Sequence, residues 1–405
     1  MAKGYNIELR KRNKYNRILN IIRNHENISR SEVKIISKYG MSTVLKGIDE
    51  LLKQGLIVES GIGESQGGRR PIWLAVNPDG GYFVGIEFYS RRIFSVILNL
   101  TGEKIYDNKT DIEPDSNSAA ILQSLKGVIK EMLDFLGSAA SKVFGIGIGV
   151  PGQINKQAGI SIEYGHIHGW SNIHIKDEIE KTFDIPAYIE NNTKVMALAH
   201  KWLKPYGEAE DFLFLCIRSG IGMACMLNDQ LYLGKNNNAG EIAHFALPNS
   251  NRRCYCGKIG CLDMEASNDA ILSKIREGIK VGRFAQLSAM AEDPDAIDMD
   301  IFVQAVKMGY DDAMELLEET ATYLGYALAA AINILNPGKI VIWGDISKTE
   351  DIFIEMLWES IRRYALSLNL QDLKIEYSQW GEDLGALGAA TLIMQQEFGF
   401  FDAPI

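Results

Sequence analysis

Residues 240–267 read GEIAHFALPNSNRRCYCGKIGCLDMEAS, and four side chains in this stretch have the chemistry of a zinc site: His244, Cys254, Cys256 and Cys261. Structural zinc is held by four tetrahedral nitrogen and sulfur ligands. A Cys-x-Cys pair with a third Cys five residues on supplies three of them, and the preceding His supplies the fourth. The alternatives are buried thiols beside a core histidine, or disulfides, which a chain without secretory features disfavours. The pattern predicts a structural Zn²⁺ site.

The bulk composition is typical of a globular protein with more than one domain. At 405 residues the chain exceeds the size at which one core keeps growing, so two or three domains are expected. Its first residues, MAKGYNIELRKRNKYNR, lack the apolar stretch of a signal peptide, and no run has the roughly eighteen apolar residues of a membrane span. Five cysteines, three of them clustered, suit a reducing compartment. We therefore expect a cytoplasmic protein that does not contact a membrane.

Charge is distributed unevenly along the chain. Residues 1–76, here called the head, contain 14 Lys and Arg against 7 Asp and Glu, a net charge of +7. Subtraction from totals of 42 and 52 leaves 28 basic and 45 acidic residues in the remainder, a net charge of −17. A basic head on an acidic chain is typical of a surface that binds phosphate groups.

The head has the pattern of a winged helix-turn-helix domain. Apolar residues at helical spacing predict a first helix over residues 13–25, and Ser29 forms with Glu32 a capping box that opens a second helix. Ser42 is predicted to cap a third helix, whose N-terminal residues would face the major groove of DNA. A hairpin over residues 61–73 would form the wing, although a generic basic hairpin is the alternative for that segment alone. The predicted DNA-binding residues are Ser42, Thr43 and Lys46 on the helix and Arg69 and Arg70 on the wing.

The body, residues 77–405, repeats one order of elements. Paired strands over 82–87 and 93–99 precede a helix over 118–138 and an apolar strand over 143–150. A second hairpin, over 212–217 and 222–227, is again accompanied by long helices. The repetition predicts an α/β body with two similar lobes. We place the first lobe at 77–193 and the second at 194–405, with a C-terminal helix that returns to the first lobe.

Six motifs in the body resemble those of the ROK family, which contains repressors and sugar kinases. They are Gly149-Val-Pro-Gly152, Glu190-Asn191, Gly220-Ile-Gly222, Gly240-Glu-Ile-Ala-His244, Cys254-x-Cys-Gly-x-x-Gly-Cys261-Leu-Asp263 and Asn336-Pro337. The resemblance extends over nearly the whole chain, including the winged head of the family's repressors. It implies a two-lobed, actin-like (ribonuclease-H-type) body, and it places the family's zinc ligands on the four residues named above. It also implies a sugar site, whose residues here would be Gly152, Asn191, Asn192, Glu241, His244 and Asp263.

The features that the family's kinases need for phosphoryl transfer are altered in this chain. Residues 87–91, Glu-Phe-Tyr-Ser-Arg, replace the Asp-x-Gly-Gly-Thr phosphate loop, and Asn192 replaces the aspartate base. Gly344-Asp345 replaces a Gly-Gly nucleotide loop. An amide has no useful basicity, and general acid–base help is worth ~10²–10⁴ in rate. We therefore predict no catalytic residues and no enzyme activity.

The favoured hypothesis is a sugar-responsive transcriptional regulator that represses carbohydrate-utilisation genes. It would bind operator DNA as a homo-oligomer, either a dimer or a tetramer, and a small-molecule sugar would be its effector. One ring nitrogen of His244 could contact zinc and the other a sugar hydroxyl, so the metal would position the site without doing chemistry. Two alternatives stay open: a ROK sugar kinase with a regulatory DNA-binding head, and a repressor released by a protein partner.

Overall fold

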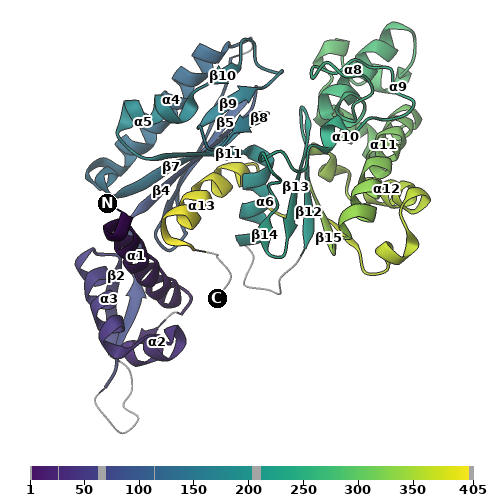
Figure 1. Ribbon diagram of the computed structural model, residues 1–405. Coiled ribbons are helices and arrows are strands. Elements are labelled where there is room, and N and C mark those ends of the chain that lie inside the picture. Colours follow the sequence, from purple (N-terminus) through teal and green to yellow (C-terminus); the bar gives the residue numbers. More distant parts are fainter. Residues whose placement is uncertain (1, 26, 63–69, 114, 203–210, 401–405) are drawn as a thin grey trace. The chain divides into compact units, whose positions relative to one another are not determined.

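The computed structural model describes residues 2–25, 27–62, 70–113, 115–202 and 211–400 (Figure 1). The chain divides into two compact units, one made of residues 1–205 and 381–405 and the other of residues 206–380. Unit 1 contains the head, and unit 2 contains the predicted metal ligands. The division proposed from the sequence, after residues 76 and 193, stays a prediction. Within the described ranges, no helix has the length and apolar character needed to cross a bilayer.

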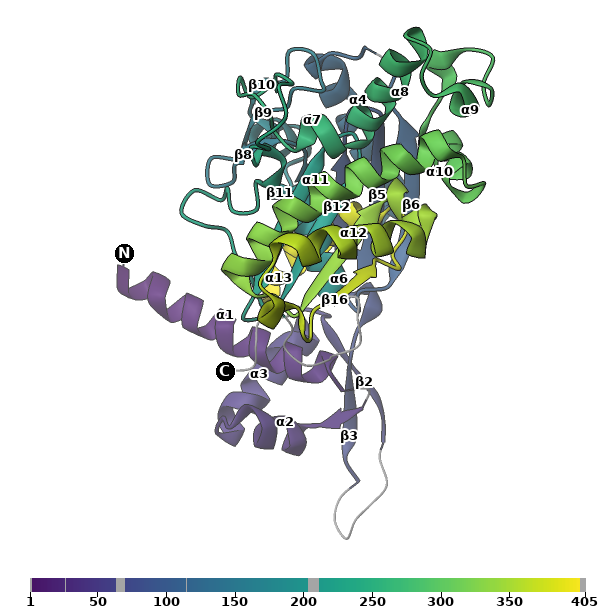
Figure 2. The same ribbon diagram turned by 90° about the vertical axis from the view of Figure 1, so that its right-hand side faces the viewer.

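The head consists of three helices and a three-stranded antiparallel sheet (Figure 2). Its elements are α1 (Ala2–Arg23), β1 (Ile28–Ser29), α2 (Arg30–Ser37), α3 (Met41–Lys53), β2 (Ile57–Ile62) and β3 (Ile72–Val76). Apolar side chains at helical spacing in α1 and α3 form its core, including Ile18, Leu19, Ile22, Val44, Ile48 and Leu51. Strands β2 and β3 pair as a hairpin, and residues 63–69 between them lie outside the described residues.

The starts of α2 and α3 test the predicted helix caps. The Ser29 hydroxyl accepts a hydrogen bond from the backbone N–H of Glu32, and the Glu32 carboxylate accepts one from the backbone N–H of Ser29, so the capping box is confirmed. The cap predicted at Ser42 is wrong, because α3 begins at Met41 and its N-cap is Gly40. The Gly40 carbonyl accepts the first helical N–H bonds. Ser42 therefore lies inside the first turn, with its side chain exposed.

The first sheet of unit 1 has five strands in the order β11-β7-β4-β5-β6. They are β4 (Tyr82–Phe88), β5 (Arg92–Asn99), β6 (Lys104–Asp111), β7 (Val143–Val150) and β11 (Ala187–Asn191), of which β4, β7 and β11 run parallel. Helices α4 (Ser118–Leu136) and α5 (Ile175–Phe183) lie on one face of this sheet and share one apolar core with it (Figure 1). A small antiparallel sheet contains β8 (Gln153–Asn155), β9 (Ile160–Glu163) and β10 (Ser171–Ile173).

The other face of the first sheet is covered by α13 (Leu384–Phe398), which packs beside α6 (Asn192–Trp202). Glycines permit this close approach. A Cβ added to Gly85 of β4 would lie 2.1 Å from the carbonyl oxygen of Ala386, and one added to Gly388 would lie 1.9 Å from that of Val195. Backbone therefore meets backbone at both contacts, and α13 forms one tightly packed body with β4 and α6.

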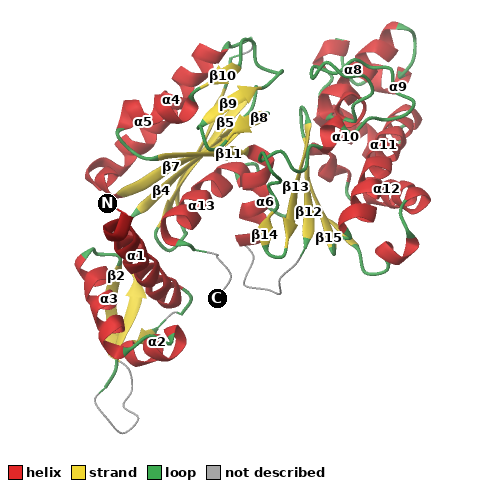
Figure 3. Ribbon diagram, in the orientation of Figure 1, coloured by secondary structure: helices red, strands yellow, loops and turns green. Residues whose placement is uncertain are grey.

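The sheet of unit 2 repeats the topology of the first sheet (Figure 3). Its order, β14-β13-β12-β15-β16, again places antiparallel strands beside parallel ones. The strands are β12 (Phe212–Ile217), β13 (Ile221–Leu227), β14 (Gln230–Leu231), β15 (Lys339–Gly344) and β16 (Lys374–Tyr377). The helices are α7 (Asp263–Ala266), α8 (Asn268–Lys280), α9 (Ala285–Ser288), α10 (Met299–Lys307), α11 (Asp311–Leu335) and α12 (Asp351–Tyr364). The repeated arrangement confirms the predicted α/β fold class with its winged head.

Candidate metal centre and sugar-binding residues

The four predicted metal ligands lie together in unit 2. Their ligand atoms are all within 4.8 Å of one another. Cys254 Sγ is 3.8 Å from His244 Nδ1, and Cys256 Sγ is 3.7 Å from Cys261 Sγ. Zinc–sulfur bonds of about 2.3 Å at tetrahedral angles would separate neighbouring sulfur atoms by about 3.8 Å. The spacing and the donor set therefore fit one zinc ion.

Short backbone turns hold the three thiols in place. The N–H of Cys254 donates to the carbonyl of Lys258 at 2.8 Å, and the N–H of Gly257 donates to the carbonyl of Cys254 at 3.0 Å. Gly257 and Gly260 have φ values of 83° and 79°, a left-handed conformation that glycine adopts without strain. No disulfide joins any of the five cysteines, all of which lie in the described residues, so the disulfide alternative is not supported.

The pKa shifts of the four side chains bear on metal binding in different ways. Burial raises the pKa of the Cys254 thiol and raises that of Cys261 to about 12, so metal binding would have to displace the protons of these two thiols to give the thiolates that bind metal. At Cys256, hydrogen bonds, first that with the backbone of Lys258, outweigh burial and lower the pKa, which favours its thiolate. Burial, with Lys258 nearby, lowers the pKa of His244 and so favours the neutral imidazole that a metal requires. A closed set of three Cys and one His leaves no coordination position for an activated water, so the ion would be structural.

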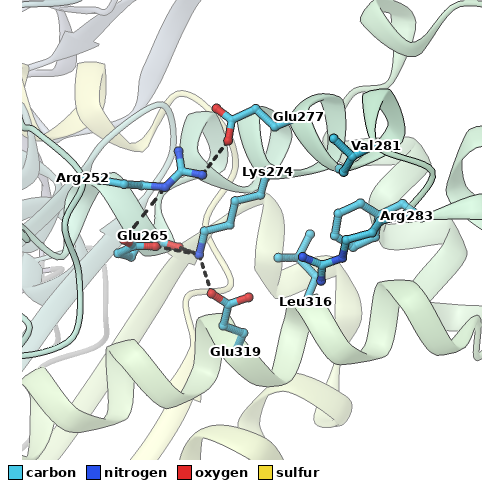
Figure 4. Close-up of a pocket in the computed structure, with 10 residues that line it drawn as sticks. Arg252, Glu265, Lys274, Glu277, Val281, Arg283, Leu316 and Glu319 are labelled. Atoms are coloured by element: carbon cyan, nitrogen blue, oxygen red, sulfur yellow. Dashed lines mark hydrogen bonds and ion pairs between the residues drawn. The ribbon is translucent and has the colours of Figure 1, made fainter.

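An ionic cluster beside the metal loop was not predicted from the sequence (Figure 4). Arg252, two residues before the first ligand cysteine, pairs with Glu277 at 2.7 Å and approaches Glu265 at 4.0 Å. Lys274 bridges Glu265 and Glu319, each at 2.8 Å. The side chains of Glu265 and Lys274 are only 6% and 10% exposed, so their charges are paired with little help from water. The cluster therefore fixes the metal loop to α7, α8 and α11.

Three of the six predicted sugar-binding residues lie in unit 2, beside the metal ligands. Glu241 is exposed. His244 is half-buried and directs Nδ1 toward a cysteine sulfur, so Nε2 lies on the opposite edge of its ring. Asp263, at the start of α7, is 3% exposed, and its Oδ1 accepts a hydrogen bond from the N–H of Ile221 at 2.6 Å. One oxygen of Asp263 therefore fixes the turn at residues 220–222.

The other three predicted sugar-binding residues lie in unit 1, where β7 and β11 end. Asn191 Nδ2 donates to the carbonyl of Gly152 at 3.1 Å. Asn191 Oδ1 accepts from the backbone N–H groups of Thr193 and Lys194, and so caps α6. Gly152 has a φ of 73°, which only glycine adopts easily. The structure thus brings Gly152 into direct contact with Asn191, and Asn192 is the next residue in the chain. Both asparagines are half-exposed.

Asn192 is bonded to the residue that begins the altered phosphate loop. Its Nδ2 donates to Glu87 Oε1 at 3.3 Å. Glu87 is 0% exposed, and a Cβ added to Gly385 of α13 would lie 2.4 Å from Glu87 Cγ. Beyond the strand, the ring of Tyr89 stacks on Phe94 with 6.4 Å between centroids. Side chains therefore fill the place where a phosphate loop would present bare backbone.

The second altered loop also carries a fixed charge. The carboxylate of Asp345 accepts a hydrogen bond from the side-chain amide of Asn268 at 2.9 Å and pairs with Lys348 at 3.1 Å. An anion held there by two partners disfavours a nearby phosphate group.

The predicted DNA-binding residues on α3 differ in exposure. Ser42 and Lys46 are exposed on its first two turns, and Thr43 is half-buried between them. Arg70 is exposed just before β3, whereas Arg69 lies outside the described residues.

The sequence reasoning missed two residues on the same helix surface. Met41 and Leu45 are 38% and 36% exposed on α3. The signal was present in the spacing, because Val44 and Ile48 are four residues apart and Leu45 lies about 100° away around the helix.

Comparisons with known proteins agree with the architecture. The sequence model of the ROK family matches residues 83–396. A xylose repressor of Caldicellulosiruptor bescii is 30% identical, and the alignment covers 95% of this chain and 96% of that protein. A solved ROK family transcriptional regulator, described as a homolog of the E. coli MLC protein, has a TM-score of 0.82 at 26% identity and covers 96% of this chain and 98% of its own. A ROK family glucokinase from Streptomyces griseus, solved with glucose and AMPPNP, has a TM-score of 0.67 at 20% identity and covers 78% of this chain and 100% of its own.

Proposed function

The chain belongs to the ROK family, and on that premise we propose that it is a sugar-responsive transcriptional repressor that binds operator DNA through its head. The observation that carries this proposal is the outward surface of α3, where Ser42 and Lys46 are exposed on the first two turns. Helix-turn-helix proteins insert these N-terminal residues of the recognition helix into the major groove. The net charge of +7 over residues 1–76 supports contacts to phosphates, which supply affinity.

The proposal includes the absence of sugar phosphorylation. The family's transferring base is replaced by Asn192, whose amide is bonded to the buried Glu87 carboxylate. Neither group is placed to accept a proton from a sugar hydroxyl, because the amide lacks basicity and the carboxylate has no solvent-accessible surface. The second loop carries the fixed charge of Asp345. A sugar kinase with a regulatory head is therefore the less supported function.

The candidate hydroxyl-binding residues for the sugar remain polar in each unit. Asn191 and Asn192 offer half-exposed amides at the start of α6, next to the carbonyl of Gly152. In unit 2 the candidates are Glu241, Asp263 and Nε2 of His244. A site built to hydrogen-bond hydroxyl groups rejects analogues that lack them, so we expect selectivity among sugars.

Zinc would support this site without taking part in chemistry. His244 would bind the ion through Nδ1, which fixes the direction of Nε2. The cysteines would bind as thiolates, and the loop that carries them is tied to α7 through Arg252 and Glu265. Removal of the ion would therefore disturb the position of Asp263, two residues before Glu265 in α7.

A packed route within unit 1 would carry the signal from sugar to DNA. Helix α6 starts at Asn192 and packs backbone to backbone on α13. The C-terminal carbonyls of α13 contact α1 of the head: Asn16 Nδ2 donates to the carbonyl of Glu397 at 2.9 Å, and Asn20 Nδ2 donates to that of Gly399 at 3.0 Å. A shift of α6 on sugar binding would reach α1 through this one helix, and two heads in an oligomer would change their spacing on DNA.

The proposal is tested with the full-length protein in three steps. Selection from a random duplex library should yield a preferred operator, and affinity for it should fall as salt rises. Thermal-shift screening against free and phosphorylated sugars should give a ligand that raises the melting temperature, and that ligand should weaken operator binding. ATP with the same sugar should give no ADP above a heat-treated control.

The outcomes of these steps separate the candidate functions. Sugar-dependent ADP formation would favour the kinase. An operator without any sugar hit would favour release by a protein partner. Sedimentation of the operator complex would give the oligomeric state, which we propose to be a dimer or a tetramer. We also propose a cytoplasmic location, because none of the five cysteines is in a disulfide, as is usual in a reducing compartment.

A further inference from the structure

The recognition helix exposes apolar side chains among its polar ones. Met41 and Leu45 are 38% and 36% exposed and lie four residues apart, so they occupy one strip of the helix surface. Ser42 and Lys46, also four residues apart, form the neighbouring strip. The first two turns of α3 thus present an apolar strip, Met41 and Leu45, beside a polar strip, Ser42 and Lys46.

The rotation of α3 about its axis is fixed by the core of the head. Val44 and Ile48, on the strip that flanks Met41 and Leu45 toward the core, are 0% exposed. Gly47 lies against α1 so closely that a Cβ there would be 2.5 Å from Ile18 Cδ1. The helix therefore cannot turn to bury Met41 or Leu45 without breaking this contact. Their exposure is a property of the folded head.

The chemistry of the strip matches one feature of duplex DNA. In the major groove, thymine alone among the four bases presents a methyl group, and apolar side chains recognise it by contact. We propose that Met41 and Leu45 bind the 5-methyl groups of thymines in each operator half-site, while Ser42 and Lys46 bind polar base edges or phosphates. This inference rests on the proposed DNA-binding function and specifies the bases that the head prefers.

Charge favours DNA over a protein as the occupant of this strip. Exposed lysines lie on α2 and α3 and just after the first of these helices: Lys34 in α2, Lys38 after it and Lys46 in α3. Cationic side chains complement a polyanion, and they bring phosphates to the surface over a range of about a Debye length, roughly 8 Å at physiological salt.

The test compares thymine with deoxyuridine, which lacks only the methyl group. An operator is first selected from random duplexes with the full-length protein, and each of its thymines is then replaced singly by deoxyuridine. At the contacted positions the wild-type protein should bind about fourfold more weakly, the effect of one lost buried methyl group. Leu45→Ala and Met41→Ala should bind the thymine operator more weakly, and each should become insensitive to one of the replacements.

Val58→Ala is the matched control, because Val58 lies on β2 and is 40% exposed. It should keep the full thymine preference. If no duplex is enriched, the proposed DNA-binding function fails and this inference fails with it. If an operator is enriched but wild type binds every deoxyuridine duplex as tightly as the thymine duplex, the inference is overturned while the function stands. That second result needs no variant, so it does not depend on how the variants fold.

Discussion

The side-chain amide of Asn192 donates a hydrogen bond to the carboxylate of Glu87 across 3.3 Å, linking the start of α6 to the end of β4. The Glu87 side chain lies against glycines of two other elements. A Cβ added to Gly149 of β7 would lie 3.1 Å from Glu87 Cγ, and one added to Gly385 of α13 would lie 2.4 Å from it. Its carboxylate cannot move away from Asn192 without displacing β7 or α13. The amide at position 192 is therefore suited to its neighbour as a hydrogen-bond donor, which an aspartate would not be.

Restoring the kinase residue should damage the protein without restoring phosphorylation. In Asn192→Asp, two carboxylates would face each other and Glu87 would lose the hydrogen bond from Asn192, at a cost of about 2 kcal/mol in the free energy of unfolding. Denaturant unfolding should show the lower free energy of unfolding. An assay of ADP formed from ATP and sugar should still detect no sugar-dependent ADP. Asn117→Asp is the control, because Asn117 is an exposed N-cap of α4 where aspartate caps equally well. Measurable sugar kinase activity in Asn192→Asp would contradict the account of the altered phosphate loop.

Removing one metal ligand should remove the metal, stability and the sugar response together. Cys256→Ser should reduce zinc from one ion per chain to near zero, as measured by inductively coupled plasma mass spectrometry. Structural zinc contributes ~10 kcal/mol or more in isolated zinc-finger peptides, and 1 kcal/mol shifts the melting temperature of a unit of this size by about 2–4 °C. Loss of even a quarter of that stabilisation, about 2.5 kcal/mol, would lower the melting temperature by about 5–10 °C, and we expect a fall of at least that size. The melting temperature of the wild-type protein treated with a chelator should fall by a similar amount.

Cys225→Ser is the matched control for the metal centre. Cys225 is a buried thiol of β13 outside the four-ligand cluster, so its loss also places a hydroxyl in the core. That variant should lose some stability but keep its zinc and its sugar response. Normal zinc content in Cys256→Ser would show that the ligand assignment is wrong.

Features that depend on neighbouring residues in the chain were predicted well from the sequence. The capping box of Ser29 and Glu32 needs only a three-residue spacing, and β7 has the predicted bounds, Val143–Val150. The four metal ligands also come from eighteen consecutive positions, so their approach required only short turns.

Side-chain contacts between residues far apart in the chain were not predicted. Glu87 and Asn192 are 105 residues apart, and the cluster of Arg252, Glu265 and Lys274 joins a loop to two helices, so no periodicity marks either. The first helix was predicted over residues 13–25 but extends over Ala2–Arg23, because its polar N-terminal turns lack an apolar stripe.

The capping box makes the stability of α2 depend on pH. The hydrogen bond from the Ser29 side chain, then that from its backbone N–H, holds the pKa of Glu32 below its ordinary value of 4.5. A carboxylate whose pKa is lowered by folding stabilises the folded state above that value, and this contribution is lost as pH falls through the lowered pKa. Ser29→Ala should reduce the stability of α2 by about 1 kcal/mol at pH 7, and the difference should narrow below about pH 4.5.

Amide hydrogen exchange of α2 measures this effect, with wild type and variant compared at each pH so that intrinsic exchange rates cancel. Ser31→Ala is the control, because Ser31 is an exposed serine inside α2 that is not its N-cap. A Ser29→Ala deficit that stayed constant from pH 7 to pH 3 would show that Glu32 ionisation plays no part in the cap.

The contact between α1 and α13 should carry the coupling between sugar and operator. Asn16 and Asn20 donate to the carbonyls at the C-terminal end of α13, and the guanidinium of Arg23 lies 4.7 Å from the centre of the Phe400 ring just beyond it. Glu397 in the same turn also bonds to the hydroxyl of Tyr188 on β11. The head is thus joined to β11, the strand that ends at Asn191, one of the proposed sugar-binding residues.

The double variant Asn16→Ala, Asn20→Ala removes both amide donors and leaves the DNA surface of α3 and the start of α6 intact. By linkage, the factor by which sugar weakens operator binding must equal the factor by which operator weakens sugar binding, and such factors are typically about 5–150. We expect both factors to fall together toward 1 in the double variant, while it still binds sugar alone and operator alone. Asn13→Ala, an exposed asparagine on the same helix, should keep the wild-type factor. Titration calorimetry of sugar with and without operator gives the factor by which operator weakens sugar binding. Operator binding measured with and without sugar gives the factor by which sugar weakens operator binding. Full coupling in the double variant would mean that the signal reaches the DNA-binding head by a route other than α13.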